Sequence, residues 1–293
     1  MSKIIFIVFL LTLSACQPGK SGSFFSPIAS KSSAAKEAQI SYESGDFQKA
    51  EQQYSSLVKS YPKNAEYLLG LANTKRRLGD YDGANAEYEK LLWLNPQNVD
   101  ALEGRGLILL EKGDNQKAID QLTKVLEVDA VRWKSINALG VAFAAQNNHK
   151  LAVDYYTDAL SLSDSNHSPV ILNNLALSHA FLGDYRKAGE LLNKALTQLS
   201  GGVSGSDKEK FKKTELNLSL VYGIQGRTDE AERILRKYFS EPQVYNNLGI
   251  YAHLANDNDL ARSYINKAIS SSPATYESAW DTLKRIEPLV SKE

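Results

Sequence analysis

A pattern of turn-forming, small and apolar positions recurs along the chain between residues 34 and 274. Each turn signal opens with Gly or Asn, and the first four are spaced by 34 residues. The seven turn positions are Gly45, Gly79, Gly113, Asn147, Gly183, Gly226 and Asn256. Gly and Asn tolerate the left-handed conformation just past a helix end, and a following Asp can cap the next helix. The pattern predicts helix pairs joined at these turns, and its fixed period predicts a solenoid.

The second helix of each predicted pair carries an alanine at a constant distance from its turn. Five residues after the turn positions stand Ala50, Ala84, Ala118, Ala152, Ala188, Ala231 and Ala261. One helical turn further on stand the larger side chains of Tyr54, Tyr88, Leu122, Tyr156, Leu192, Leu235 and Ile265. A small side chain at a fixed helical place lets a neighbouring helix come close. We therefore expect an all-α fold in which these alanines lie where helices pack together.

The later part of the array departs from the regular pattern. The sixth repeat, near residues 212–241, is short at its end, and the stretch "SGGVSGSD" at 200–207 has the composition of a loop insert. Such an insert bends a solenoid or splits it into two sub-arrays, and the sequence leaves both open. After the last repeat, residues 275–293 are predicted to supply a capping helix and a tail. The side chains expected on one face of that helix are Tyr276, Ala279, Trp280, Leu283 and Ile286.

These features together resemble the tetratricopeptide repeat over about four-fifths of the chain. The resemblance implies about seven helix-pair repeats, with the first helix of each pair on the concave face of the solenoid. It also implies a function in binding other proteins.

The chain begins with the layout of a secretory signal peptide over residues 1–15. Lys3 precedes an apolar run, Ile4–Leu13, which is shorter than the roughly 20 residues of a membrane-spanning helix. The next residues, Leu13 to Cys16, resemble the lipobox of bacterial lipoproteins. The resemblance implies that residues 1–15 are removed and that Cys16 is acylated. The alternative is a small buried cysteine. Residues 16–33 are predicted to form a flexible tether that reaches roughly 20–25 Å.

Gln17 follows the cysteine, where the lipoprotein resemblance implies transport to the outer membrane rather than retention at the inner one. The expected location is therefore the periplasmic face of the bacterial outer membrane, with the protein held by its lipid anchor.

Composition narrows the functional classes. The chain is 43% hydrophobic and its formal net charge is zero, which favours a folded repeat protein over a disordered one and argues against nucleic acid as a partner. Its four histidines show no metal-ligand spacing, and Cys16 is the only cysteine. No motif for nucleophilic catalysis is recognisable in the sequence. We therefore predict no metal, no cofactor and no catalytic residues.

The exposed positions of the first helices predict a partner-binding groove with an apolar stripe flanked by amides. Its candidate residues are Asn137, Val141, Asn173, Asn174, Leu177, Asn217, Leu220, Asn246, Asn247 and Ile250. Amides can satisfy a peptide backbone, and the stripe suits the apolar face of a helix. The alternative, that these asparagines pair with neighbouring repeats and hold the stack, is equally open. A further candidate site, which would bind a carboxylate, consists of Asn73, Arg76 and Arg77.

The stretch from Glu215 to Ala268, "ELNLSLVYGIQGRTDEAERILRKYFSEPQVYNNLGIYAHLANDNDLARSYINKA", resembles the end of the TadD family of tight-adherence (Flp) pilus assembly lipoproteins. In that family a shortened repeat is followed closely by a last one. The resemblance implies a scaffold that binds an outer-membrane or periplasmic assembly protein, such as a secretin subunit. The alternatives are a general adaptor for outer-membrane biogenesis or cell-wall enzymes, and an enzyme with an acid or base clustered on the concave face. The sequence says nothing of the oligomeric state.

Overall fold

The computed structural model describes residues 33–164, 168–200, 205–272 and 277–286. Within these ranges the chain forms fifteen helices and no strand, which confirms the predicted all-α fold. The predicted signal peptide, Cys16 and all of the predicted tether except Ser33 lie outside the described residues.

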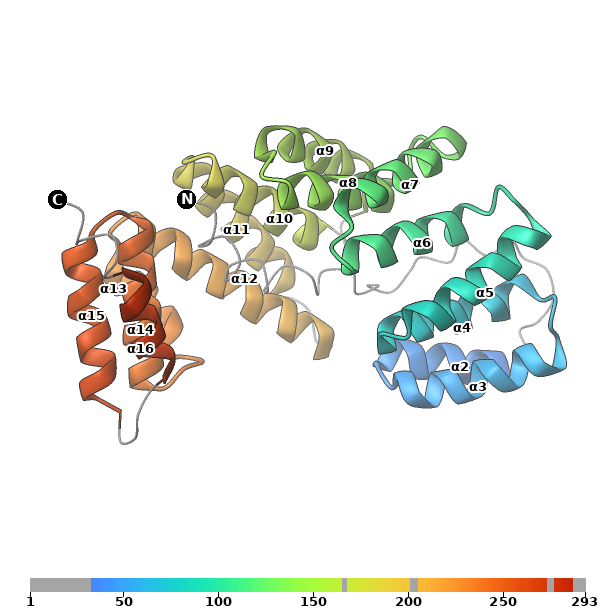
Figure 1. The fold of residues 1–293 in the computed structure, drawn as a ribbon, viewed down its shortest axis with the longest axis horizontal. Coiled ribbons are helices and arrows are strands. Elements are labelled where there is room, and N and C mark those ends of the chain that lie inside the picture. The colour runs from blue at the N-terminus through green and yellow to red at the C-terminus, as the bar shows by residue number, and fades with distance from the viewer. Residues whose placement is uncertain (1–32, 165–167, 201–204, 273–276, 287–293) are drawn as a thin grey trace. The chain divides into compact units, whose positions relative to one another are not determined.

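The helices follow one another as antiparallel pairs (Figure 1). In chain order they are α2 (Ser33–Ser44), α3 (Phe47–Ser60), α4 (Ala65–Leu78), α5 (Tyr81–Leu94), α6 (Val99–Glu111), α7 (Asn115–Val128), α8 (Trp133–Ala145), α9 (His149–Leu162), α10 (Ser168–Phe181), α11 (Tyr185–Leu199), α12 (Gly205–Ile224), α13 (Thr228–Leu235), α14 (Glu241–Leu254), α15 (Asn258–Ser270) and α16 (Glu277–Ile286). The even-numbered helices from α2 to α14 are the first helices of seven repeats, and α16 follows the last repeat.

The chain divides into two compact units, and the division falls inside α10. The N-terminal unit runs to Ile171 and contains the repeats α2/α3, α4/α5, α6/α7 and α8/α9. The C-terminal unit begins at Leu172 and contains most of α10 together with α11 to α16. Each unit has its own apolar clusters, and each is described by itself below.

All seven predicted turn positions adopt the left-handed conformation. The five glycines have positive φ angles, and so do the two asparagines, Asn147 at 62° and Asn256 at 64°. In five of the seven turns the next residue accepts a hydrogen bond from the first turn of the following helix; these residues are Asp46, Asp80, Asn148, Asp184 and Asp257. The turns therefore end one helix and start the next, as the pattern predicts.

The seven predicted alanines are fully buried, and the larger residues one turn after them are buried as well. In two places the larger residue is a tyrosine whose ring lies against a glycine of the next repeat. A Cβ atom on Gly70 would lie 2.3 Å from Tyr54 Cε1, and one on Gly104 would lie 2.2 Å from Tyr88 Cζ. Neighbouring repeats of the N-terminal unit are thus held together by aromatic rings in spaces that only glycine leaves open.

The C-terminal unit contains the irregular sixth repeat. Its first helix, α12, has 20 residues, whereas its second helix, α13, has only 8, against 13 to 15 in the other second helices. The predicted loop insert is too long at its end, because residues 205–207 already belong to α12. Residues 201–204 lie outside the described part of the chain.

Helix α16 packs against the last repeat. Ala279 is buried and Leu283 lies against the cluster formed by Ala252, Ala261, Ile265 and Ala268. The apolar end of the array is therefore covered, which a solenoid requires for solubility. Tyr276 lies outside the described residues.

Candidate partner-binding surface on the first helices

The structure places the ten predicted groove residues on the first helices α8, α10, α12 and α14, but most are not exposed. Asn137, Asn173, Asn174, Leu177, Asn217 and Asn246 are buried, whereas Val141, Leu220, Asn247 and Ile250 are half-buried. The expectation of exposure was wrong for the first six. The reason is that a first helix packs against the first helices of adjoining repeats as well as against its own partner, as α6 does with α4 and α8.

Two of the predicted amides bind each other. Asn217 of α12 donates from Nδ2 to Oδ1 of Asn173 of α10 over 2.8 Å, and both side chains are buried. For this pair the structure favours the packing alternative, because the bond joins two repeats and satisfies groups that would otherwise be buried without a partner.

Asn246 differs from that pair. Its side chain is only 5% exposed, and its Oδ1 accepts no hydrogen bond. A buried acceptor without a partner costs about 1–3 kcal/mol of folding free energy. Such a group is unusual in a native fold and calls for an explanation.

Three other predicted groove residues on α12 and α14 are half-buried. Asn247 and Ile250 follow Asn246 on α14, and Leu220 comes from α12, which packs against α14. Leu220 and Ile250 cover the cluster of Ala231, Leu235, Val244, Leu248 and Tyr251. Asn247 donates from Nδ2 to the carbonyl oxygen of Gln243 over 2.8 Å, so its Oδ1 is directed away from that bond. We call Leu220, Asn246, Asn247 and Ile250 the α12–α14 face.

The cluster beneath this face is apolar enough to change the ionisation of a tyrosine. Burial raises the pKa of Tyr251 to about 12, while its hydroxyl group shares a hydrogen bond of 3.1 Å with Ser219 Oγ. Charged contacts lie at the margin instead. Lys237 Nζ binds Glu215 Oε1 over 2.5 Å, and Tyr238 also donates to that carboxylate. The α12–α14 face itself carries no charged side chain.

In the N-terminal unit, the residues predicted to grip a carboxylate are engaged within the array. Arg76 Nη1 lies 2.5 Å from Glu111 Oε1, and Asn73 Oδ1 accepts a hydrogen bond of 2.6 Å from the Tyr88 hydroxyl group. Arg76 therefore does bind a carboxylate, but that carboxylate belongs to Glu111 of the same chain. The contact joins the first helices α4 and α6.

A second ion pair joins α6 to the start of α8, and sequence reasoning missed it. Arg132 Nε lies 2.8 Å from Glu103 Oε2, which also accepts a hydrogen bond of 2.9 Å from Ser135 Oγ. Arg132 also binds Asp100. The only sequence signal for these contacts is a separation close to one repeat, 29 residues for Arg132 with Glu103 and 35 for Arg76 with Glu111.

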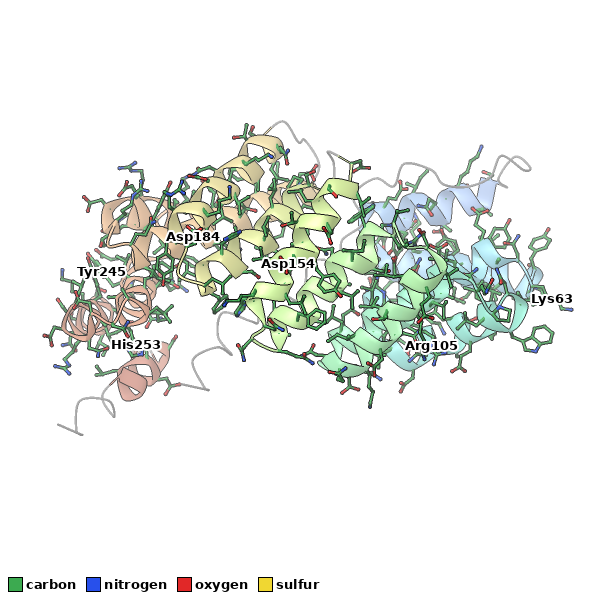
Figure 2. The ribbon with its side chains drawn as sticks, turned by 90° about the horizontal axis from the view of Figure 1, so that it is seen from above. Lys63, Arg105, Asp154, Asp184, Tyr245 and His253 are labelled. Carbon is green, nitrogen blue, oxygen red and sulfur yellow. The ribbon has the colours of Figure 1, made fainter. Side chains whose placement is uncertain are left out.

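The described residues show no cluster of side chains suited to binding a metal ion. Nowhere in the described part of the chain do three His, Cys, Asp or Glu side chains group as metal ligands. Burial lowers the pKa of His149 and of His179. Among the described helices, none combines the length and the apolar character needed to cross a membrane. Figure 2 shows His253 on α14, where its Nδ1 lies 2.7 Å from Asn258 Oδ1.

Sequence profiles of the tetratricopeptide repeat match almost the whole array. One matches residues 36–74, 69–132 and 109–167, a second matches 168–240, and a third matches 242–275. No curated protein sequence matches the chain.

Solved structures with the same fold include three that cover most of the chain. The APC/C hetero-tetramer Cut9–Hcn1 aligns with a TM-score of 0.68 at 19% identity over 98% of this chain, which spans 53% of the length of that protein. A tetratricopeptide repeat protein from Parabacteroides merdae aligns at 0.54 and 18% identity, covering 86% of this chain and 97% of its own. PilF of Pseudomonas aeruginosa aligns at 0.56 and 15% identity, covering 75% and 97%. Repeat profiles and fold agree, and the chain belongs to the tetratricopeptide-repeat family.

Proposed function

We propose that this protein is a lipid-anchored scaffold that binds an envelope protein and aids the assembly of a secretin or Flp pilus machine. A tetratricopeptide array is a scaffold suited to protein–protein interaction, and its fold is typically non-catalytic. The lipobox-like residues Leu13 to Cys16 support the anchor. The likeness of residues 215–268 to the Flp pilus assembly lipoproteins supports the kind of machine.

The observation that carries the binding role is the unsatisfied acceptor beneath the α12–α14 face. Oδ1 of Asn246 forms no hydrogen bond although it is buried, and Leu220 and Ile250 are half-buried on the same two helices, α12 and α14. A donor from a bound partner, reached by a small rotation of the Asn246 amide, would recover the free energy that the lone acceptor costs. A binding surface has a use for such an acceptor, whereas in the free protein the acceptor contributes no stability.

The chemistry of the face indicates the kind of segment that it binds. Leu220 and Ile250 offer apolar area without charge, and the amides of Asn246 and Asn247 offer acceptors for N–H groups. A short segment with an apolar side and free N–H donors fits this combination, and we propose that a secretin subunit supplies it. The apolar contact provides most of the affinity, and the amides set the register.

The test measures binding of a purified secretin subunit from the same organism to variants of this protein. Asn247→Ala and Leu220→Ser are expected to weaken binding several-fold. The matched control is Asn193→Ala on the second helix α11, because Asn193 also donates to its own helix, to the Gly189 carbonyl oxygen over 2.9 Å. Each asparagine-to-alanine substitution removes the same kind of hydrogen bond within a helix. A difference in binding between the two variants therefore reports a role of Asn247 in binding.

Cells that lack the protein provide the second measurement. If the proposal holds, secretin multimers are reduced in these cells and are restored by the Asn193→Ala variant but not by Leu220→Ser. Normal secretin assembly without the protein would overturn the pilus role and leave a tetratricopeptide scaffold with a different client.

A further inference from the structure

An apolar row runs along one edge of the N-terminal unit, away from the first-helix surfaces described above. Leu94, Val128 and Leu162 are the last residues of α5, α7 and α9, and they are separated by 34 residues each. They thus occupy the same place in three successive repeats. All three are 38–43% exposed, although leucine and valine are usually buried.

Three more exposed apolar residues flank this row. Trp93 is 78% exposed, Val131 is 65% exposed, and Tyr61 is 59% exposed. Each lies at the end of a second helix or in the loop that follows it. We call Tyr61, Trp93, Leu94, Val128, Val131 and Leu162 the apolar edge. Single exposed apolar residues are ordinary, but a run of them along one edge marks an interaction site.

The row of Leu94, Val128 and Leu162 is confined to the second, third and fourth repeats. In the first, fifth and seventh repeats the residues at the same distance from the turn as Leu94 are Ser60, Gln198 and Ser271, and the second helix of the sixth repeat ends before this position. Packing of a repeat therefore does not demand an apolar residue at this position. Its use in three consecutive repeats calls for a cause outside the array.

We propose that the apolar edge lies in the interfacial layer of the membrane that carries the lipid anchor. The inference rests on the proposed function for that anchor. The apolar edge belongs to the unit that directly follows the tether, and a tether of residues 16–33 reaches roughly 20–25 Å. The anchor would thus hold the N-terminal unit at the lipid surface, where even a weak apolar contact is occupied because the effective concentration is high.

The composition of the edge fits a lipid surface. Trp and Tyr concentrate at membrane–water interfaces because one part of each ring is apolar and another part forms hydrogen bonds. The two aromatic residues here, Trp93 and Tyr61, are among the most exposed apolar side chains of the described chain. Leucine and valine add further apolar area at the same place in three successive repeats.

The charges beside the edge are balanced. The loops after α3 and α7 carry Lys63, Asp129 and Arg132, and the loop after α9 carries Asp164. Lys63 is labelled in Figure 2, and Arg132 is bound to Glu103 and Asp100. Contact with lipid is therefore expected to depend on apolar insertion and only weakly on anionic headgroups or on salt.

The experiment places an environment-sensitive dye on the edge of the full-length protein. Cys16 is the only cysteine, and acylation consumes its thiol, so a cysteine introduced elsewhere is the single free thiol. Val128→Cys carries the dye at the edge, and Ser271→Cys carries it at the equivalent position of the last repeat. Both acylated proteins are incorporated into vesicles of phosphatidylethanolamine and phosphatidylglycerol, with circular dichroism as the check on folding.

The expected result is a blue shift and a several-fold rise in fluorescence on vesicles for the dye at residue 128, with none at residue 271. Adding Trp93→Ser and Leu162→Ser to the first protein should at least halve that rise. The absence of a response at residue 128, in acylated protein that floats with the vesicles, would overturn the inference while leaving the anchor intact. A rise in fluorescence at residue 128 that occurs without lipid and grows with protein concentration would also overturn the inference. It would indicate that a second copy of the chain covers the apolar edge.

If the chain is not acylated, the lipid anchor of the proposed function is lost, but the apolar edge can still be tested. The same two labels are then read on the Cys16→Ser protein with vesicles at millimolar lipid. A response at residue 128 alone still supports the inference, and equal or absent responses at residues 128 and 271 overturn it.

Discussion

At the scale of single residues, the contact between Tyr88 and Gly104 shows how closely neighbouring repeats approach. Glycine within a helix usually lowers stability, because its unfolded chain is more flexible. Gly104 is retained in α6 because the Tyr88 ring occupies the space that a Cβ atom would fill. The hydroxyl group of the same ring is held by Asn73, so the ring is fixed at both ends.

Gly104→Ala is therefore expected to lower the free energy of unfolding by about 1–3 kcal/mol, although the same change usually stabilises a helix. Gly189→Ala in α11 is the matched control, since its new Cβ would meet only Val221 Cγ1, at 4.0 Å. That control should raise stability by about 0.5–1 kcal/mol. Urea titrations of the two variants, each followed by a probe in the unit that carries the substitution, give both values, and the same sign for both would contradict the steric explanation.

Tyr251 makes the C-terminal unit sensitive to alkaline pH. Burial raises its pKa to about 12, above the value near 10 of a tyrosine in the unfolded chain. Between these values the folded state binds more protons than the unfolded state, so stability falls as pH rises. The expected loss from this group is about 1.4 kcal/mol per pH unit.

Tyr251→Phe cannot ionise, so its unfolding free energy should fall less steeply between pH 10 and 12. At neutral pH the variant should be about 1 kcal/mol less stable than the natural protein, because Ser219 loses a partner. Urea unfolding at several pH values checks both expectations. Parallel pH profiles for the two proteins would show that Tyr251 does not titrate in the way proposed.

The predicted amides show where residue-level reasoning from sequence ends. The sequence correctly placed Asn173, Asn217 and Asn246 on first helices, but it could not show which were exposed. Asn173 and Asn217 lie 44 residues apart and bind each other, whereas Asn246 Oδ1 binds nothing. Whether two residues so far apart in the sequence come into contact depends on how each helix is rotated about its axis within the stack. That rotation is set by packing, which the composition of one helix does not reveal.

At the scale of helices, the regular parts of the array could be predicted and the irregular part only in outline. Each left-handed turn and each buried alanine requires one residue type at a fixed place in the repeat. Gly79 alone therefore predicts a turn, and Ala84 alone predicts a buried position. The start of α12 was missed because Gly, Ser and Asp at 205–207 suit a loop and a helix start equally well. The shortness of α13 is visible in sequence only as a reduced distance to the next repeat.

The packing of second helices leads to a prediction for Ala84. It is fully buried in α5 within the cluster that also contains Tyr88 and Leu68. Ala84→Leu should overpack this place and cost about 1–3 kcal/mol. Ala65→Leu at the exposed start of α4 makes the same chemical change and should cost less than about 0.5 kcal/mol. Thermal melts followed by circular dichroism compare the two, and equal melting temperatures would show that the crossing is not tightly packed.

At the scale of the whole molecule, the chain combines a predicted lipoprotein signal with a tetratricopeptide array. The N-terminal sequence predicts where the protein is held, and the repeats supply surfaces for partners. Because the array consists of two compact units, its unfolding is not expected to follow a single two-state transition. Stability changes should therefore be measured with probes in the unit that carries the substitution.

Lipidation at Cys16 is tested by Cys16→Ser. The natural protein purified from bacterial membranes should lack residues 1–15 and carry added acyl mass, and the variant should be released from the membrane fraction. Intact mass and fractionation give the two results. A variant that stays equally bound, with no uncleaved precursor to explain it, would show that Cys16 does not anchor the chain.

The restriction of helix contacts to close neighbours has a consequence for how the protein folds. Described helices pack on the next helix or the next but one, and the bond between Asn173 and Asn217 spans only 44 residues. Proteins with such local contacts have low contact order and fold quickly, since little loop entropy is lost before contacts form. A chain that emerges one end first can therefore complete its early repeats while the later ones are still being made.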